Sequence, residues 1–136
     1  MLLIKDSTGD WEGFQQVLEA RAAKPSARVL QGMDELALRS IVAGADGVLT
    51  GLTNLAPDLY ARLVKSAQAG DMEEAQILQS RIESVCELFK EGFWVECLKY
   101  AVSCLGIESG HLCGRPHTLS AESKDRIRQI VETLVR

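Results

Sequence analysis

The segment Leu2-Leu3-Ile4-Lys5-Asp6-Ser7-Thr8-Gly9-Asp10 places three apolar residues directly before a polar stretch. A continuous apolar run without alternation is typical of a strand buried on both faces, as in a parallel sheet. Asp10 can cap a helix that starts at Trp11. The segment therefore predicts a strand followed by a helix, with Lys5 at the carboxyl end of the strand.

Two further strands are predicted downstream, each followed by a glycine and then by a helix. They cover residues 28–31, before Gly32, and residues 48–50, before Gly51. Asp34 stands where it can cap the helix between them. Strands that alternate with helices predict a parallel sheet with right-handed crossovers, and hence an α/β fold.

The remainder of the chain is predicted to be helical. Pro57 stands at the start of a helix, a position that proline tolerates well. Helices are expected over residues 57–69, 72–90 and 93–105, and in a last segment that Ser120 caps and that carries Ile127, Ile130, Val131 and Leu134 on one face.

The length of 136 residues is too short for a complete (β/α)₈ barrel, which needs about 250 residues. On length alone an open α/β sandwich would fit three strands. The sequence also starts directly on a strand, which suggests the middle of a larger fold.

Composition narrows the classes of function. The net charge of −4, without a basic excess, argues against nucleic-acid binding. The longest apolar runs are far below the roughly 18 residues of a membrane span, and the first residues lack the apolar core of a signal peptide. The four cysteines form no C-x-x-C pair and are expected to be reduced thiols. We therefore expect a cytoplasmic protein.

Lys5 stands where parallel α/β folds bind their ligands. Apolar neighbours such as Ile4 would partly desolvate its amine and disfavour the ammonium form. A neutral amine can attack a ketone, and the resulting imine draws electrons from an adjacent C–C bond. The alternative is a lysine that merely ends a strand and reaches solvent, which the local pattern alone favours.

Five segments, in order and covering essentially the whole chain, resemble motifs of one known family. Leu3–Asp10 resembles its I-K-[DE]-[ST]-[ST]-G-D segment, residues 29–35 its strand seven, and residues 44–54 its strand eight. Gly70-Asp71 with Ala75-Gln76 resembles the signature of its helix eight, and Cys113-Gly114-Arg115-Pro116 resembles the loop before its last helix. The family is that of dihydrodipicolinate synthase and N-acetylneuraminate lyase.

The resemblance implies an α/β fold that is part of a TIM (β/α)₈ barrel. Strands six to eight with their helices would occupy residues 1–69, and a C-terminal helical extension would occupy residues 70–136. It further implies a catalytic Schiff-base lysine, Lys5, and substrate-binding positions at Ser7, Gly32, Asp34, Glu35, Leu49 and Gly51. No metal and no cofactor is implied.

Each implied role has a plainer alternative. Asp34 could simply cap a helix, Gly51 could simply end a strand, and Asp46 is expected to fill a turn. The family's proton-relay tyrosine, its arginine and its carboxylate-binding hydroxyl residues precede the segment that matches Lys5, so they have no counterpart in this sequence. Tyr60 and Tyr100 are predicted on helices far from the strand ends.

Two hypotheses follow from the resemblance. The chain could be a fragment of a pyruvate-dependent lyase or aldolase that acts on pyruvate or another 2-oxo acid through Lys5, with residues 32–35 slightly favouring hydroxylated substrates. Alternatively it is a non-catalytic, truncated or split half-barrel that needs a complementary N-terminal half and is inactive alone. Exposed strand edges would favour homo-oligomers or association with that half.

Two other constellations are weaker. Cys104, His111, Cys113 and His117 are metal-ligand residue types, but their spacing matches no closed zinc motif. The glycines near the second and third strands could hold a phosphate, yet residues 47–54 contain no basic side chain.

Overall fold

The computed structural model describes residues 2–107 and 118–135. Its sheet has three parallel strands in the order β1, β2, β3, formed by Leu2–Asp6, Ala27–Gln31 and Gly47–Val48. Lys5 lies in register with Leu30, and this register fixes which side chains share a face of the sheet. The α/β class and the parallel sheet are as the sequence predicts.

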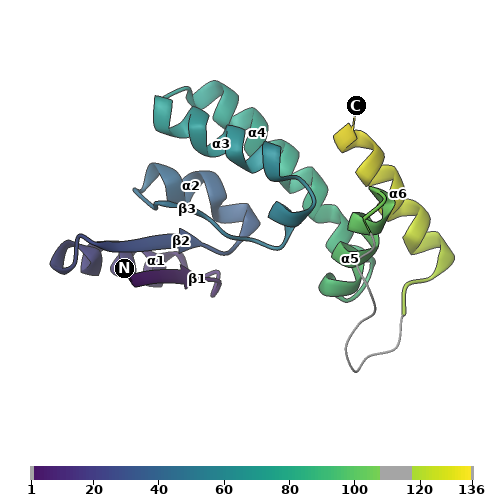
Figure 1. The fold of residues 1–136 in the computed structure, drawn as a ribbon, viewed down its shortest axis with the longest axis horizontal. Coiled ribbons are helices and arrows are strands. Elements are labelled where there is room, and N and C mark those ends of the chain that lie inside the picture. Colours follow the sequence, from purple (N-terminus) through teal and green to yellow (C-terminus); the bar gives the residue numbers. More distant parts are fainter. Residues whose placement is uncertain (1, 108–117, 136) are drawn as a thin grey trace.

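Six α-helices complete the described part of the chain. α1 and α2 follow the first two strands, α3 and α4 pack side by side, and α5 and α6 lie on the side toward which the carboxyl ends of the strands point (Figure 1). Their bounds are Trp11–Ala20, Ala37–Val42, Pro57–Ala69, Met72–Cys86, Trp94–Cys104 and Ala121–Val135. Short 3-10 turns cover Arg21–Ala23, Asp34–Leu36, Leu52–Asn54 and Glu87–Glu91.

Several predicted helix ends are confirmed. The Asp10 carboxylate accepts a hydrogen bond from the backbone N–H of Glu12 at 3.1 Å, which caps α1. The Ser120 hydroxyl accepts one from the N–H of Ser123 at 3.0 Å and caps α6. Gly70 closes α3 in the left-handed conformation, with φ at 79°.

Apolar side chains form two cores. The smaller core joins α1 and α2 to one face of the sheet through Phe14, Val29 and Ile41. The larger core holds the later helices together and includes residues on both sides of position 70, such as Leu63 and Leu78. The division of the chain between residues 69 and 70 therefore stays a prediction.

The expectation that the first strand is buried on both faces is wrong. Leu2 and Leu3 are 43% and 49% exposed. In β2, Ala27, Val29 and Gln31 are buried beneath the helices, while the alternate residues are not. Because alternate residues of a strand point to opposite faces, the helices cover one face of the sheet, and the described residues leave the other largely open.

Two other expectations also need correction. β3 is a two-residue strand over Gly47–Val48 instead of residues 48–50, although Leu49 still donates a backbone hydrogen bond to the Gln31 carbonyl at 2.8 Å. The predicted helix over residues 72–90 ends at Cys86 and continues as a 3-10 turn. In the described part of the chain, no helix is long and apolar enough to cross a bilayer.

Candidate functional site

An open cavity of about 510 Å³ lies at the carboxyl ends of β1 and β3 and contains the Lys5 side chain. Two sets of residues line it: Lys5, Leu49, Thr50, Gly51 and Asn54 from the sheet end, and Trp94, Val95, Leu98, Lys99 and Val102 from α5. The structure therefore brings together Lys5 and two of the positions that the resemblance assigned to the substrate, Leu49 and Gly51.

Lys5 is exposed, so the desolvation expected from its apolar neighbours is not found. Its register with Leu30 places it on the face of the sheet that the helices do not cover. Alternate residues of a strand point to opposite faces, and Lys5 therefore shares the open face with Leu3. The Lys5 side chain is exposed to solvent because no helix covers this face of the sheet, even at the strand ends.

Gly32 makes room for the Lys5 side chain. A Cβ atom built at Gly32 would lie 2.7 Å from Lys5 Cε, 2.7 Å from the Asp6 carbonyl oxygen and 2.0 Å from Ser7 Oγ. The Gly32 N–H also donates to that carbonyl at 2.6 Å. Ser7 and Gly32 thus lie against Lys5, and only a residue without a side chain fits between them.

The loop after β1 is held by its own polar groups. Asp6 Oδ1 accepts hydrogen bonds from the backbone N–H of Thr8 at 2.8 Å and from the Thr8 hydroxyl at 2.7 Å. Such a local bond from an aspartate to the second residue onward stabilises a turn. The turn fixes where the chain leaves Lys5 and enters α1.

Asp34 does not cap a helix, contrary to one expectation. Met33 occupies the N-cap position of the following 3-10 turn, without a side-chain cap. The Asp34 carboxylate is buried and accepts a hydrogen bond from the Tyr60 hydroxyl. Tyr60 therefore reaches the loop after β2, whereas its helix was expected to lie far from the strand ends.

Burial dominates the electrostatics of this pair. Desolvation raises the pKa of Asp34 above its ordinary value, and the hydroxyls of Thr50 and Tyr60 partly offset that rise. Burial and the nearby Asp34 charge raise the pKa of Tyr60. Thr50 Oγ1 is itself buried, and in the described residues it makes no hydrogen bond of normal geometry. Among the described residues, the hydrogen bond that the Asp34 carboxylate accepts from a side chain therefore comes from the Tyr60 hydroxyl.

Gln79 of α4 also holds the loop after β2, and sequence reasoning gave it no role. Its Oε1 accepts from the backbone N–H of Leu38 at 3.0 Å, and its Nε2 donates to the Asp34 carbonyl at 3.2 Å and to the Glu35 carbonyl at 3.5 Å. The Glu35 residue is exposed. A polar residue at a buried position of an amphipathic helix was the one signal that could have singled out Gln79.

The carboxyl end of β3 meets α5. A Cβ atom built at Gly51 would lie 3.3 Å from side-chain carbons of both Leu98 and Trp94. Gly51 therefore permits close packing of α5 against the strand end, which brings Trp94 and Lys99 to the cavity. Sequence reasoning missed these two residues, because helical periodicity does not say which strand end a helix faces.

Asp46 lies outside this site. It bonds Arg21 at 2.8 Å, Arg28 at 3.0 Å and the backbone N–H of Val29 at 2.8 Å. The Val29 N–H is the main cause that lowers the pKa of Asp46, helped by the two arginines. Its function is to tie β2 to the segment before β3.

Some predicted features lie outside the described residues. These are the loop Cys113-Gly114-Arg115-Pro116 and the candidate metal ligands His111, Cys113 and His117. Within residues 2–107 and 118–135, no group of three or more histidine, cysteine or acidic side chains could hold a metal ion.

Solved structures share this fold. Dihydrodipicolinate synthase from Bacteroides thetaiotaomicron matches 97% of the chain with a TM-score of 0.89 at 28% identity, and the match covers 46% of that protein. YagE from Escherichia coli K12, solved in complex with pyruvate, matches 99% of the chain with a TM-score of 0.87. At 20% identity, this match shows that the two chains share a fold and nothing more.

The chain is also similar in sequence to named enzymes. A 4-hydroxy-tetrahydrodipicolinate synthase of Pelodictyon phaeoclathratiforme is 34% identical over 96% of the chain and 44% of its own length. An N-acetylneuraminate lyase of Citrobacter koseri is 30% identical over 83% of the chain and 37% of its own length. The chain thus spans less than half the length of these relatives. The model of the dihydrodipicolinate synthetase family matches residues 1–134, and the chain belongs to that family.

Proposed function

We propose that the chain is part of a Schiff-base-forming, pyruvate-dependent lyase or aldolase in which Lys5 forms the imine. The position of Lys5 carries the proposal, because its side chain shares one cavity with Leu49 and Gly51 at the strand ends. The sequence relatives support it, since they include an N-acetylneuraminate lyase and a protein named a probable 2-dehydro-3-deoxy-D-pentonate aldolase. Pyruvate in the YagE complex agrees with a 2-oxo acid as substrate.

The three strands would be strands six to eight of a (β/α)₈ barrel. Residues 1–69 would supply these βα units, and residues 70–136 the helical extension. The uncovered face of the sheet supports this assignment, because the inward face of such a barrel is filled by side chains of the other strands. Lys5 and Leu3 would then point into the barrel.

The chemistry begins when the neutral Lys5 amine attacks the keto carbon of the substrate. A proton transfer and the loss of water give a protonated imine. In cleavage, the hydroxyl on the second carbon from the imine carbon gives its proton to a base and becomes the carbonyl group of a released aldehyde. The electron pair of the broken C–C bond moves to the imine and forms an enamine. Protonation of the enamine and hydrolysis release pyruvate and restore Lys5. Synthesis runs these steps in reverse.

The remaining positions would shape the site around the imine. Ser7 and Gly32 lie against the Lys5 side chain, and Leu49 and Gly51 line the cavity. Asp34 and Glu35 would be the acidic pair that accepts hydrogen bonds from substrate hydroxyls. A hydroxyl at Asp34 would have to share the carboxylate with Tyr60, which already donates to it.

A second candidate is a non-catalytic half-barrel that needs a complementary N-terminal half. The exposure of Lys5, Leu2 and Leu3 favours it, because an imine-forming amine works best where water is excluded. An edge strand with free backbone groups also invites pairing with another chain.

Reduction with borohydride in the presence of pyruvate separates the two candidates. We expect a trapped adduct that intact mass reveals and peptide mapping places at Lys5. Lys5→Arg should abolish it, while Lys99→Arg, which changes another lysine of the same cavity, should retain it. Trapping that appears only after co-expression with the N-terminal half of a relative supports the second candidate. An adduct at Lys99 instead, or none under either condition, contradicts the imine at Lys5.

A further inference from the structure

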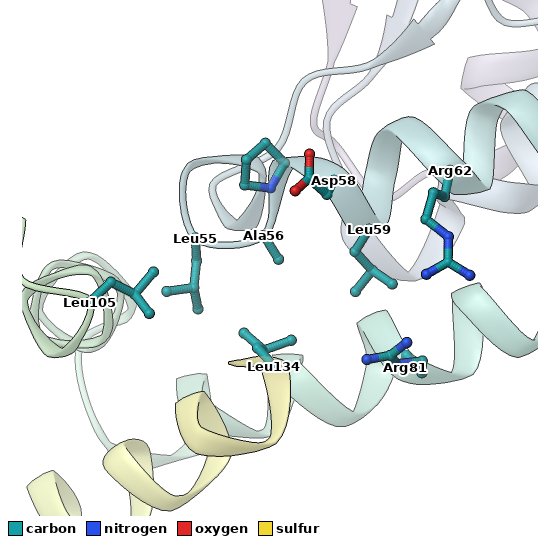
Figure 2. Close-up of a pocket in the computed structure, with 9 residues that line it drawn as sticks. Leu55, Ala56, Asp58, Leu59, Arg62, Arg81, Leu105 and Leu134 are labelled. Atoms are coloured by element: carbon teal, nitrogen blue, oxygen red, sulfur yellow. The ribbon is translucent and has the colours of Figure 1, made fainter. Parts of the chain in front are cut away.

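A second cavity, of about 210 Å³, lies among the helices. It opens between the start of α3, the middle of α4 and the ends of α5 and α6 (Figure 2). It shares no lining residue with the cavity that contains Lys5. All of its walls come from described residues of this chain, so it does not depend on a complementary half.

One side of this helical cavity is apolar. The side chains of Leu55, Leu105 and Leu134 point toward one another there, and Leu59 lies between them and the opposite side (Figure 2). Leu55 and Leu59 are 4% and 7% exposed. An apolar cavity of about 150 Å³ can hold a benzene molecule. This cavity therefore has room for an alkyl chain of about five carbons together with its polar head.

The opposite side carries positive charge. Arg62 of α3 and Arg81 of α4 bring their guanidinium groups near each other from the two helices (Figure 2). Glu74 forms an ion pair with Arg62 and matches its charge. Arg81 makes no ion pair or hydrogen bond with any residue in the described part of the chain, which leaves its five N–H donors for a ligand.

Asp58 is the acidic residue of the lining. It lies in the first turn of α3, where the N-terminal end of the helix dipole stabilises a carboxylate, and it forms no ion pair with either arginine. Because it would repel an anion placed beside it, the ligand's charged group has to sit at Arg81.

We propose that this cavity binds a small monocarboxylate with an unbranched apolar tail, of the size of hexanoate. The carboxylate would accept two parallel hydrogen bonds from the Arg81 guanidinium. The tail would lie against Leu55, Leu105 and Leu134. The ligand needs both the carboxylate and the tail. An uncharged alcohol would leave the Arg81 guanidinium without an anion. A carboxylate without a tail would leave the apolar surface of the three leucines exposed to water.

The test uses the chain itself, with labelled leucine methyl groups followed by NMR during titration with sodium hexanoate. We expect saturable shifts at Leu55, Leu59, Leu105 and Leu134. Hexanol, acetate and hexylamine should each bind more weakly than hexanoate. Arg81→Gln should weaken hexanoate binding by about tenfold or more.

Lys65→Gln is the matched control, because it removes a positive charge from the exposed surface of α3 outside the cavity. It should leave the affinity unchanged. Equal affinity for hexanol and hexanoate, an unchanged affinity in Arg81→Gln, or an absence of shifts at these leucines would each overturn the proposal. Since binding here involves no imine, the result is independent of pyruvate trapping at Lys5.

Discussion

The Tyr60 hydroxyl donates a hydrogen bond to the buried carboxylate of Asp34 and thereby joins α3 to the loop after β2. The two residues are 26 positions apart in the sequence. Both side chains are buried, so the removal of either one leaves the other with less hydrogen bonding. The contact fixes the loop that begins with Gly32, one of the proposed substrate positions.

Tyr60→Phe should lower the free energy of unfolding by about 1–3 kcal/mol at neutral pH, because it leaves a buried carboxylate with less hydrogen bonding. The Tyr60 hydroxyl lowers the pKa of Asp34, so its loss raises that already raised pKa further. A group with a raised pKa in the folded state costs stability as the pH rises above its ordinary value. The deficit should therefore shrink toward pH 4, as urea unfolding at both pH values would measure.

Tyr100→Phe is the control for this prediction. The Tyr100 hydroxyl also has one partner, since it accepts from Arg128 Nη2 at 2.8 Å, but that contact is exposed. Its loss should change the free energy of unfolding by no more than about 0.5 kcal/mol. If the two substitutions lowered the free energy of unfolding equally, burial of Asp34 would not explain the stability that the Tyr60 contact contributes.

The local elements of the fold could be predicted from the sequence, and their contacts could not. The apolar run before Lys5, and the caps at Asp10 and Ser120, depend on neighbouring residues, so they indicated strands and helix starts correctly. The pairing of Tyr60 with Asp34 depends on how α3 packs on the sheet. No local pattern encodes that packing, and Asp34 was accordingly predicted to bind substrate or to cap a helix, without Tyr60 as its partner.

The exposure of β1 is a second property that the local sequence does not determine. The run Leu2-Leu3-Ile4 predicts burial on both faces, since apolar side chains leave water where neighbours cover them. Whether a neighbour exists is a property of the surrounding structure and not of the run itself. The position of Lys5 at a strand end was therefore predictable, whereas its exposure was not.

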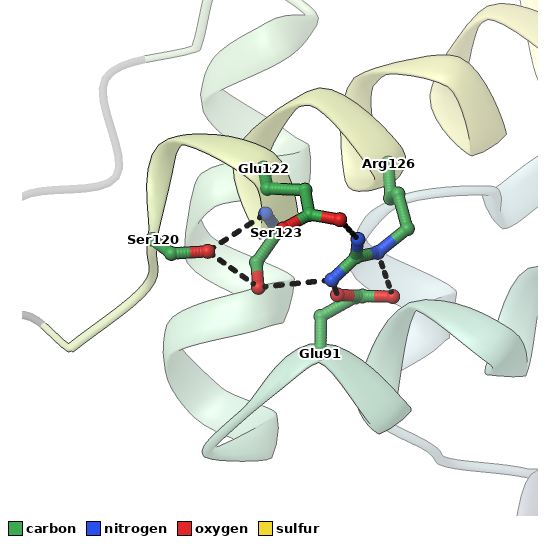
Figure 3. Close-up of polar contacts among 5 residues, drawn as sticks. All are labelled: Glu91, Ser120, Glu122, Ser123 and Arg126. Carbon is green, nitrogen blue, oxygen red and sulfur yellow. Dashed lines mark hydrogen bonds and ion pairs between the residues drawn. The ribbon is translucent and has the colours of Figure 1, made fainter.

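Glu91→Gln should destabilise the attachment of α6. Arg126 forms two contacts with the Glu91 carboxylate, both at 2.7 Å, and contacts Glu122 at 2.6 Å and Ser123 at 3.5 Å (Figure 3). Arg126 lowers the pKa of Glu91. A lowered carboxyl pKa gives stability that is present above the ordinary value and is lost as the pH falls through the folded value.

The midpoint of thermal unfolding should therefore fall in Glu91→Gln at pH 7, and the difference from the parent chain should narrow in acid. Glu122→Gln is the matched control, because Glu122 binds the same arginine from an 81% exposed side chain while that of Glu91 is 14% exposed. It should shift the midpoint less, since exposed ion pairs contribute little. A larger shift in the Glu122 variant would contradict the stabilising role of the Glu91 contact.

Cys86 should resist alkylation in the folded chain. Burial, with help from the charge of Asp34, raises the pKa of its thiol to about 12. The thiolate is the reactive form, so iodoacetamide at pH 9 should label Cys86 far more slowly in the folded chain than in urea. Mass spectrometry of the Cys86 peptide would measure the two rates. Similar rates in both states would contradict the raised pKa of this half-buried thiol.

The same shift predicts a loss of stability in base. An unfolded thiol has a pKa of about 8.5, so above that pH the unfolded state releases a proton that the folded state keeps. The free energy of unfolding should decline as the pH rises from about 8.5 toward 12. Cys86→Ala should make this decline shallower, as urea unfolding at successive pH values would show. An unchanged slope would indicate that other groups cause the decline.

Gly32→Ala should impair both folding and imine formation. Its Cβ would lie 2.7 Å from the Asp6 carbonyl oxygen, a backbone atom that β1 holds in place, and 2.7 Å from Lys5 Cε. Such overpacking costs about 1–3 kcal/mol, and the displaced lysine should trap less pyruvate. Gly47→Ala is the control, because its Cβ would meet only a Leu30 methyl group, at 3.3 Å.

A double variant separates the contacts around Gly32. Ser7→Ala removes the hydroxyl that would lie 2.0 Å from the new Cβ, but it leaves the contacts with the Asp6 carbonyl and Lys5 Cε. Ser7→Ala combined with Gly32→Ala should therefore recover little stability and little trapping. If the combination restored both, the hydroxyl of Ser7 would be the obstacle, and Gly32 would not be what gives the Lys5 side chain its path to the cavity.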